Sequence, residues 1–305
     1  MVGREDLVNA IALNSSMVNG ARVVGPAVAG VLVAALGEGW CFFANGLSYL
    51  AVIAALLMMD VPRRSLPPPE ASVMAHLAEG FRFVARTPPI RAMLILLGVV
   101  SFTGMPYAVL MPIFADDIFH VGARGLGILM GASGIGALMG SIALARRTGV
   151  TGLGRWVAAA GASFAVSLVL FSLSRSFALA VALLVPVGAS MIVQMAASNT
   201  LIQSMVPDAL RGRVMGVYSM MFLGMAPLGA LLAGALAGPL GARGTLAAGG
   251  VICLLASAVF ALRLPSLRPH ARRLILAQHA AGGDPPEEAT GTTVAVDGEE
   301  PIDPA

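Results

Sequence analysis

The sequence predicts an all-α membrane protein that crosses the bilayer several times. Hydrophobic residues make up 57% of the 305 positions, charged residues only 11%, and the mean hydropathy is +0.86. The apolar residues form continuous runs, many of them as long as the roughly 20 residues that a helix needs to cross the hydrocarbon. Continuous runs also argue against a transmembrane β-barrel, in which apolar and polar residues alternate along each strand.

Eight of these runs have the length and composition of a membrane-spanning helix. None has an Asp or Glu in its interior, and the nearest acidic residues lie at the ends of the runs. We therefore predict a polytopic helical bundle with eight transmembrane helices in this chain. The predicted spans are 11–36, 40–60, 91–115, 124–145, 155–173, 177–203, 213–238 and 244–263.

All 19 basic residues are arginines, and their positions predict the orientation of the chain. With residue 1 in the cytoplasm, fifteen arginines fall in cytoplasmic segments and only Arg124, Arg175 and Arg243 fall outside. The positive-inside rule then places both termini in the cytoplasm of an inner-membrane, multi-pass protein. Because the arginines are spread over separate loops, no nucleic-acid partner is predicted.

Three pairs of residues recur at a nearly constant offset. An acidic residue begins a span, a proline lies in its middle and a second proline follows the next span, and the two copies are 201 to 203 residues apart. Such regularity predicts two related halves, the parallel repeat found in some transporter folds. The pairs are Asp6 and Asp208, Pro26 and Pro227, and Pro62 and Pro265.

The repeat also predicts the domain organisation, because the first span corresponds to the seventh. Residues 1–60 are expected to be the last two helices of an N-terminal six-helix half, and residues 91–265 a complete six-helix second half. A full first half would need about 110 residues, or four helices, before Met1. Residues 266–305 lose their apolar periodicity and turn acidic, so we expect a disordered cytoplasmic tail.

Residues 61–90 are expected to form a cytoplasmic connector between the halves. Within it, Val73, Leu77, Phe81 and Val84 recur at helical spacing, which predicts an amphipathic helix. This helix would lie along the membrane surface or, alternatively, form a solvated linker.

Arg22 is the most unusual residue of the first span. A helix that starts near Ile11 places this guanidinium about 16 Å deep, close to the bilayer centre. A charge there costs at least about 2.5 kcal/mol, so it is normally turned inward and is often functional. We predict that Arg22 and the neighbouring Asn19 line a transport pathway; the alternative is an arginine satisfied by carbonyls at a kink near Pro26.

A second polar row lies on span 177–203, where Ser190, Gln194 and Ser198 stand four residues apart. This row suits the wall of a substrate cavity, although interhelical hydrogen bonds, worth about 0.6 kcal/mol each, would also explain it. Two further polar residues flank Pro106 in span 91–115. The predicted pathway residues are therefore Asn19, Arg22, Thr103, Tyr107, Ser190, Gln194 and Ser198.

Several segments resemble one known family. They read DLVNAIALNSSMVNGARVVGPAVAG at 6–30, EGFRFVARTPPIRAMLILL at 79–97, GLGILMGASGIGALMGS at 125–141 and NTLIQSMVPDALRGRVMGVYSMMFLGMAPLGALLAG at 199–234. On these segments the chain resembles the major facilitator superfamily, in the branch of enterobactin exporters and related macrolide and multidrug efflux proteins. The resemblance implies twelve helices in two halves, alternating access, export of a small molecule such as a siderophore, drug or metabolite, and a proton as the coupling ion.

The resemblance also implies two conformational motifs. In the first, small residues and a Gly-Pro pair let a helix bend and approach its neighbours closely. In the second, Asp208 is expected to cap a helix N-terminus while two arginines anchor it at the cytoplasmic border. Alanine replaces the family's glycine at several positions of the first motif, so the match is to size. The motif residues are Gly25, Pro26, Ala29 and Gly30, and Asp208, Arg211 and Arg213.

Two alternatives to an active exporter stay open at this point. One is a truncated remnant or fragment that does not transport. A more distant one is an intramembrane enzyme, since GASG at 131–134 matches the Gly-x-Ser-Gly of rhomboid proteases, which need a base inside the membrane. All four histidines lie outside the spans, and GASG fits better into a face of small packing residues. No metal or cofactor is predicted, and the oligomeric state is left open.

We expect Arg22→Ala, made in the full-length protein, to abolish export while leaving membrane insertion intact. The reason is that a charge is retained at this depth only where the pathway needs it. An efflux assay, combined with detection of the variant in the membrane fraction, measures both properties. Normal efflux by the variant would assign Arg22 a structural role.

Overall fold

The computed structural model describes residues 32, 37–58, 73–147 and 149–280, and this part of the chain contains helices and no β-strand. The predicted span 11–36, with Asn19, Arg22 and the Gly-Pro motif, lies outside the described residues. The elements are α2 (Glu38–Leu57), α3 (Val73–Arg86), α4 (Pro88–Val99), η1 (Val100–Gly104), α5 (Tyr107–Ile113), η2 (Phe114–Ile118), α6 (Gly122–Ala145), α7 (Leu153–Leu173), α8 (Phe177–Met205), α9 (Asp208–Ser219), η3 (Met220–Gly224) and α10 (Met225–Ala280).

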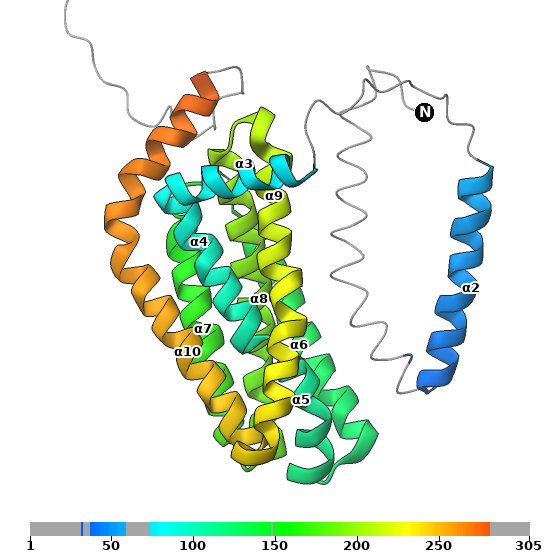
Figure 1. The fold of residues 1–305 in the computed structure, drawn as a ribbon. Helices are drawn as coiled ribbons and strands as arrows, with labels where there is room; N and C mark the ends of the chain where they lie inside the picture. The colour runs from blue at the N-terminus through cyan, green and yellow to red at the C-terminus, as the bar shows by residue number, and fades with distance from the viewer. Residues whose placement is uncertain (1–31, 33–36, 59–72, 148, 281–305) are drawn as a thin grey trace, which may run out of the picture.

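Within the described residues, six helical runs are long and apolar enough to cross a membrane. The last run, Asp208–Gln278, is 71 residues long, far more than one crossing needs. It turns back at Gly241, whose φ of 69° and ψ of 162° break the helix at a conformation that glycine adopts readily. Its two arms (Figure 1) therefore account for the predicted spans 213–238 and 244–263. The total of eight spans stays a prediction.

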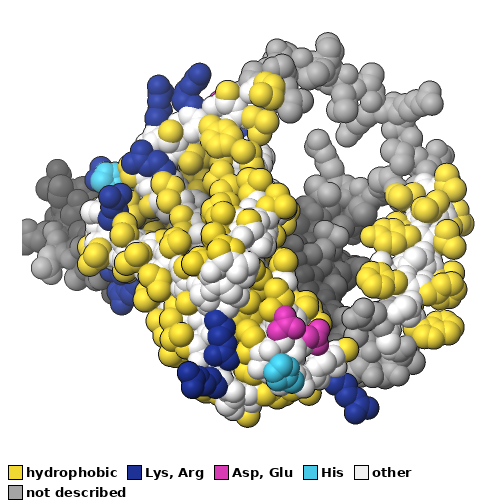
Figure 2. All heavy atoms as spheres, turned by 60° about the horizontal axis from the view of Figure 1, so that its bottom comes forward, with side chains coloured by type: hydrophobic (Ala, Val, Ile, Leu, Met, Phe, Trp, Pro, Cys, Tyr) yellow, Lys and Arg dark blue, Asp and Glu magenta, His cyan; other side chains and the backbone are white. Residues whose placement is uncertain are grey.

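The helices from α4 to α10 pass up and down beside one another as a bundle (Figure 1). Helix α8 packs between α6 and α7, and α10 packs on α7. Helix α3 lies across one end of the bundle, against α9. Helix α2 stands apart from the bundle in Figure 1, with its large apolar side chains exposed. Hydrophobic side chains also cover much of the bundle surface (Figure 2), as expected where lipid is the solvent.

Three π-helical turns interrupt the α-helical pattern of the described residues, and two of them are closely followed by a proline. η1 precedes Pro106, and η3 precedes Pro227. Proline has no N–H, so the carbonyl four residues earlier loses its usual helical partner. Inside a membrane such a carbonyl needs another partner. The two irregular turns contact each other, and the Ser101 hydroxyl of η1 donates a hydrogen bond to the Phe222 carbonyl of η3.

Glycines allow close contact with η1 from both arms of α10. A Cβ added at Gly229 would lie 2.0 Å from the Phe102 carbonyl oxygen, and one added at Gly249 would lie 2.2 Å from the Thr103 carbonyl oxygen. Both distances are far below van der Waals contact, so only glycine lets the backbones approach this closely. This close approach depends on the absence of a side chain at both glycines.

Glycines also allow close contact between α6 and α8. A Cβ at Gly136 would lie 1.9 Å from the Val185 carbonyl oxygen, and one at Gly188 would lie 1.9 Å from that of Ser133. The predicted small-residue packing face of this segment consists of Gly127, Gly131, Gly134, Gly136 and Gly140. It is confirmed at Gly136 and at Gly140, where an added Cβ would lie 2.5 Å from the Ala189 carbonyl oxygen. At Gly127 and Gly131 it is wrong, because a Cβ there would meet nothing within 4 Å.

A helix, α3, forms within the predicted connector, whose role between two halves stays a prediction. Its Val84 is buried, and Gly80 lies so close to α9 that an added Cβ would be 2.8 Å from the Arg213 carbonyl oxygen. Glu79 also pairs with the Arg213 guanidinium. One face of α3 therefore packs on the bundle, whereas Phe81, expected on that face, is exposed. A freely solvated linker is wrong for this segment.

The expected tail begins later than residue 266. Helix α10 continues to Ala280, so Pro265 lies inside the helix and does not end it. The helix persists because Leu267, Leu274 and Ile275 pack against the core. Residues 281–305 lie outside the described residues.

We expect Gly136→Ala to lower the melting temperature of the detergent-solubilised protein by several degrees. The added methyl group collides with backbone at Val185, and overpacking of this kind costs about 1–3 kcal/mol. Gly131→Ala is the matched control on the same helix, where the methyl group has open space and alanine favours the helix. Equal melting temperatures for the two variants would contradict the close approach of α6 and α8.

Candidate functional site

A small pocket lies where η1, α8 and η3 meet. Its volume is about 10 Å³, room for about one water molecule. Ser101 and Gln194 supply its polar atoms, and three methionines with Phe222 supply most of the partly exposed apolar wall. The lining residues are Leu97, Val100, Ser101, Met105, Met191, Gln194, Met195 and Phe222.

Gln194 is the unusual member of this pocket. It is only 2% exposed, yet neither its Oε1 nor its Nε2 has a hydrogen-bond partner. Ser257 on α10 is 1% exposed, and its Oγ is likewise unpartnered. The two groups converge at Gly161 of α7, where an added Cβ would lie 2.6 Å from Ser257 Oγ and 3.7 Å from Gln194 Nε2.

Unpartnered polar atoms are costly in this position. A buried group without a hydrogen bond costs about 1–3 kcal/mol, and most native buried polar groups are satisfied. Gln194 and Ser257 therefore form a polar centre at which a water molecule or a ligand group would gain hydrogen bonds. A methionine-lined entrance suits a ligand of irregular shape, because the unbranched thioether side chain adapts easily.

The other predicted pathway residues of the second half are also buried or bonded. Ser190 and Ser198 lie with Gln194 on the buried side of α8. The Thr103 hydroxyl donates to the Val99 carbonyl at 2.9 Å and lies 3.2 Å from Cys253 Sγ. The Tyr107 hydroxyl lies 3.1 Å from Ser133 Oγ. The structure thus brings Gln194 to the pocket but directs Thr103 and Tyr107 to partners elsewhere.

The conformational motif on α9 differs from its expected geometry. Asp208 is the first residue of the helix and makes no cap hydrogen bond, so the predicted N-cap is wrong. The cap position falls on Pro207, since the chain enters the helix there. Asp208 instead pairs with Arg211 across one turn at 2.5 Å, while Arg213 pairs with Glu79 of α3. The motif therefore fastens the connector helix to the bundle through Arg213.

Sequence reasoning missed most of the pocket. Met191 and Met195 stand one helical turn apart, and Ser257 is polar within a predicted span; both are visible signals in the sequence. The convergence of Met191 and Met195 with Ser101 in the pocket is not visible in the sequence, because it depends on how η1 and η3 pack on α8.

The serine of GASG also has a plain structural explanation. Ser133 contacts the Tyr107 hydroxyl, and its carbonyl faces Gly188. Among the histidines whose side chains the structure describes, His120 and His270 are exposed. His120 follows η2 and lies 2.9 Å from the Asp116 carbonyl oxygen, and His270 on α10 lies 3.2 Å from the Ser266 carbonyl oxygen, so each has a backbone partner close to it in the chain.

This architecture, a bundle of membrane-length helices with a buried polar centre, defines a polytopic membrane protein of the transporter type. A family described as transmembrane secretion effector matches residues 1–280, and the chain belongs to this family of the major facilitator superfamily. The superfamily consists of transporters and not of enzymes. The chain is thus that of a multi-pass inner-membrane protein.

Two curated relatives are named enterobactin exporter EntS. The one from Shigella boydii serotype 18 is 28% identical over 270 residues, and the one from Escherichia coli O1:K1 is 28% identical over 272 residues. Each alignment covers 88% of this chain and 64% of the relative, so the chain spans less than two thirds of their length.

One solved structure shares the fold. It is a bacterial homologue of the human lysosomal transporter Spinster in an inward-facing, unoccupied conformation. The TM-score is 0.51 at 16% sequence identity, with 90% of this chain and 72% of the other covered.

We expect two serine variants of similar burial to differ in stability. Ser101→Ala leaves the Phe222 carbonyl without its donor and should destabilise the protein by about 1 kcal/mol. Ser257→Ala removes an unpartnered hydroxyl and should leave stability unchanged or raise it slightly. Thermal unfolding in detergent measures both variants. A loss of stability in Ser257→Ala equal to that in Ser101→Ala would contradict the unpartnered state of the Ser257 hydroxyl.

Proposed function

We propose that the protein is a secondary active transporter that exports a siderophore-like small molecule by alternating access and proton antiport. The observation that carries this proposal is the family match over residues 1–280. The relatives named enterobactin exporter support the substrate class and the direction of transport.

Within this function, the pocket at Gln194 is the proposed contact point of the second half with the substrate. The unpartnered amide offers one acceptor and two donors. The surrounding methionines and Phe222 offer adaptable apolar contact. Arg22 and Asn19 are proposed to contribute from the first half, while Thr103 and Tyr107 would contribute only after their present hydrogen bonds break.

The crossing of η1 and η3 is the proposed bending point for alternating access. π-turns and prolines are common sites at which helices kink, and here two such helices meet. The glycine contacts of α6 with α8 would keep the neighbouring helices together as a unit.

The proposed orientation places both termini in the cytoplasm. In the described part of the chain, twelve arginines lie at the end of the bundle that carries α3, and three lie at the opposite end. The positive-inside rule assigns the arginine-rich end to the cytoplasm.

The test of export uses the whole protein, expressed in bacteria that make enterobactin but lack their own exporter. We expect enterobactin to appear in the medium, and a protonophore to stop its appearance. A macrolide supplied to the same cells distinguishes a drug exporter from a siderophore exporter. Retention of both compounds by the cells would favour the alternative of a remnant that does not transport.

We expect Gln194→Met in the whole protein to reduce export at least tenfold without loss of stability. The apolar side chain fits the pocket but cannot bind the substrate through hydrogen bonds. Gln203→Met on the same helix is the matched control, because Gln203 bonds locally to Asn199 at 2.6 Å and does not line the pocket. Export rates and melting temperatures are measured together. Equal export by the two variants would remove Gln194 from the pathway.

A further inference from the structure

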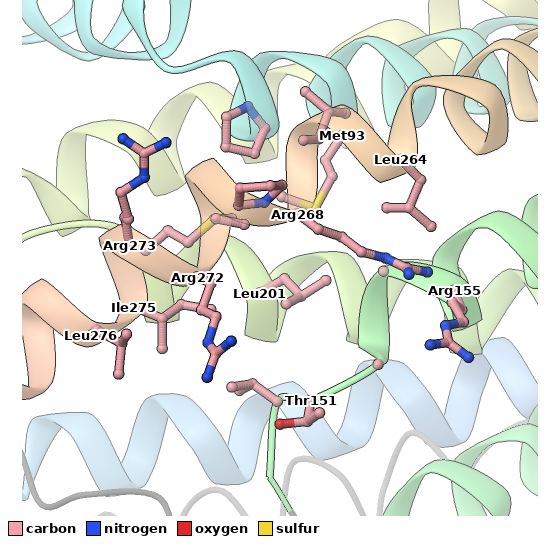
Figure 3. Close-up of a pocket in the computed structure, with 18 of the residues that line it drawn as sticks. Met93, Thr151, Arg155, Leu201, Leu264, Arg268, Arg272, Arg273, Ile275 and Leu276 are labelled. Atoms are coloured by element: carbon pink, nitrogen blue, oxygen red, sulfur yellow. The ribbon is translucent and has the colours of Figure 1, made fainter. Parts of the chain in front are cut away.

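A second and much larger pocket lies at the arginine-rich end of the bundle. Its volume is about 960 Å³, and α4, α7, α8 and α10 enclose it together with the loop before α7. Figure 3 shows side chains from these elements around it, with Arg268 extending from α10 toward α7, where Arg155 lies. The pocket is separate from the one at Gln194 and shares no lining residue with it.

The lining of this pocket has two distinct parts. One is apolar and includes Met93, Leu201 and Leu264. The other is strongly basic, with four guanidinium groups from two helices. These belong to Arg155, Arg268, Arg272 and Arg273.

The four positive charges are not compensated within the described chain. The two ion pairs of that part of the chain join Arg211 to Asp208 and Arg213 to Glu79, away from the pocket. Among the described residues, no carboxylate lines the pocket. Arginine stays protonated in proteins, so these exposed side chains give this part of the pocket a strong positive charge. The pocket therefore has the electrostatic character of an anion site.

The position of the pocket relative to the membrane surface indicates which class of anion it would bind. Trp156 follows the pocket residue Arg155, and its ring lies 5.1 Å from the Arg147 guanidinium carbon. Tryptophan and arginine are enriched where the membrane meets the cytoplasm. The apolar part of the lining comes from α4, α8 and α10 of the bundle. A ligand that fills both parts carries a negative headgroup and an apolar chain.

We propose that this pocket binds an anionic phospholipid of the cytoplasmic leaflet. The guanidinium groups would bind the phosphate, for which arginine offers a bidentate geometry, and an acyl chain would lie along the apolar wall. A volume near 960 Å³ suits a ligand far larger than free phosphate. The site concerns lipid binding and is independent of the proposed transport function.

The test uses the full-length protein purified in detergent and titrated with phosphatidylglycerol, with bound lipid counted by native mass spectrometry. We expect one phosphatidylglycerol to be retained at least tenfold more tightly than phosphatidylcholine. The double variant Arg155→Gln/Arg268→Gln should lose this preference. Arg124→Gln/Arg175→Gln is the matched control, because these exposed arginines lie at the opposite end of the bundle, and it should keep the preference.

A second variant tests the pocket independently, in case the double arginine variant does not fold. Thr151 lines the pocket from an exposed turn, so Thr151→Trp fills the pocket without removing an arginine or a core residue. It should also reduce phosphatidylglycerol retention at least tenfold, at an unchanged melting temperature.

Three results would overturn the proposal. Retention of phosphatidylglycerol by the pocket variants as strong as by the control would place the lipid elsewhere. Displacement of the lipid by millimolar inorganic phosphate would show a simple anion site. The third concerns residues 284–305, which contain seven acidic and no basic residues. Tight lipid binding that appears only after this segment is deleted would identify the segment as the natural occupant.

Discussion

The need to satisfy backbone polar groups inside a membrane is the constraint on which this structure depends most. Where the chain is α-helical the constraint is met automatically. Several prolines interrupt the ladder, and two of them, Pro106 and Pro227, are each preceded by a π-turn. These two π-turns meet, where the Ser101 hydroxyl bonds to the Phe222 carbonyl and glycines let the backbones approach closely. The arrangement of α4 and α10 follows from this meeting, because any residue larger than glycine at Gly229 or Gly249 would separate the helices.

The same constraint makes Gln194 informative. A membrane bundle rarely keeps a buried amide without hydrogen-bond partners, since each unpartnered polar group lowers the stability of the fold. Around Gln194 the helices are irregular or lined by methionine, and both features allow adjustment. The polar centre and the bending point therefore coincide in space. A transporter that changes shape around its cargo needs these two properties in one place.

The sequence predicted the helices well because a membrane span is visible as a continuous run of apolar residues. The predicted spans 155–173 and 177–203 differ from α7 and α8 by at most two residues at either end. The predicted helix ends were wrong where tertiary packing outweighs the local preference of a single residue. Pro265 was expected to end a helix, yet Leu267 and its apolar neighbours hold α10 against the core beyond it. Asp208 was expected to be the N-cap residue of this helix. The helix already begins at Asp208, so the cap position falls on Pro207.

For the candidate site, the sequence identified Gln194 through its spacing with Ser190 and Ser198. It did not identify Ser257 or Ser101, because their positions relative to Gln194 arise from crossings between helices distant in the chain. The basic pocket was missed for a related reason. Its arginines were interpreted only as topology signals, whereas the continuation of α10 to Ala280 brings Arg268 to the same pocket as Arg155.

The central claim is that the crossing of η1 and η3 moves while the neighbouring helices stay together. Hydrogen exchange of the whole protein, with and without enterobactin, tests it most directly. The account predicts that exchange changes at residues 100–106 and 220–227 and stays constant where α6 and α8 pack through Gly136 and Gly188. Unchanged exchange at the crossing, or equal changes throughout the bundle, would contradict it.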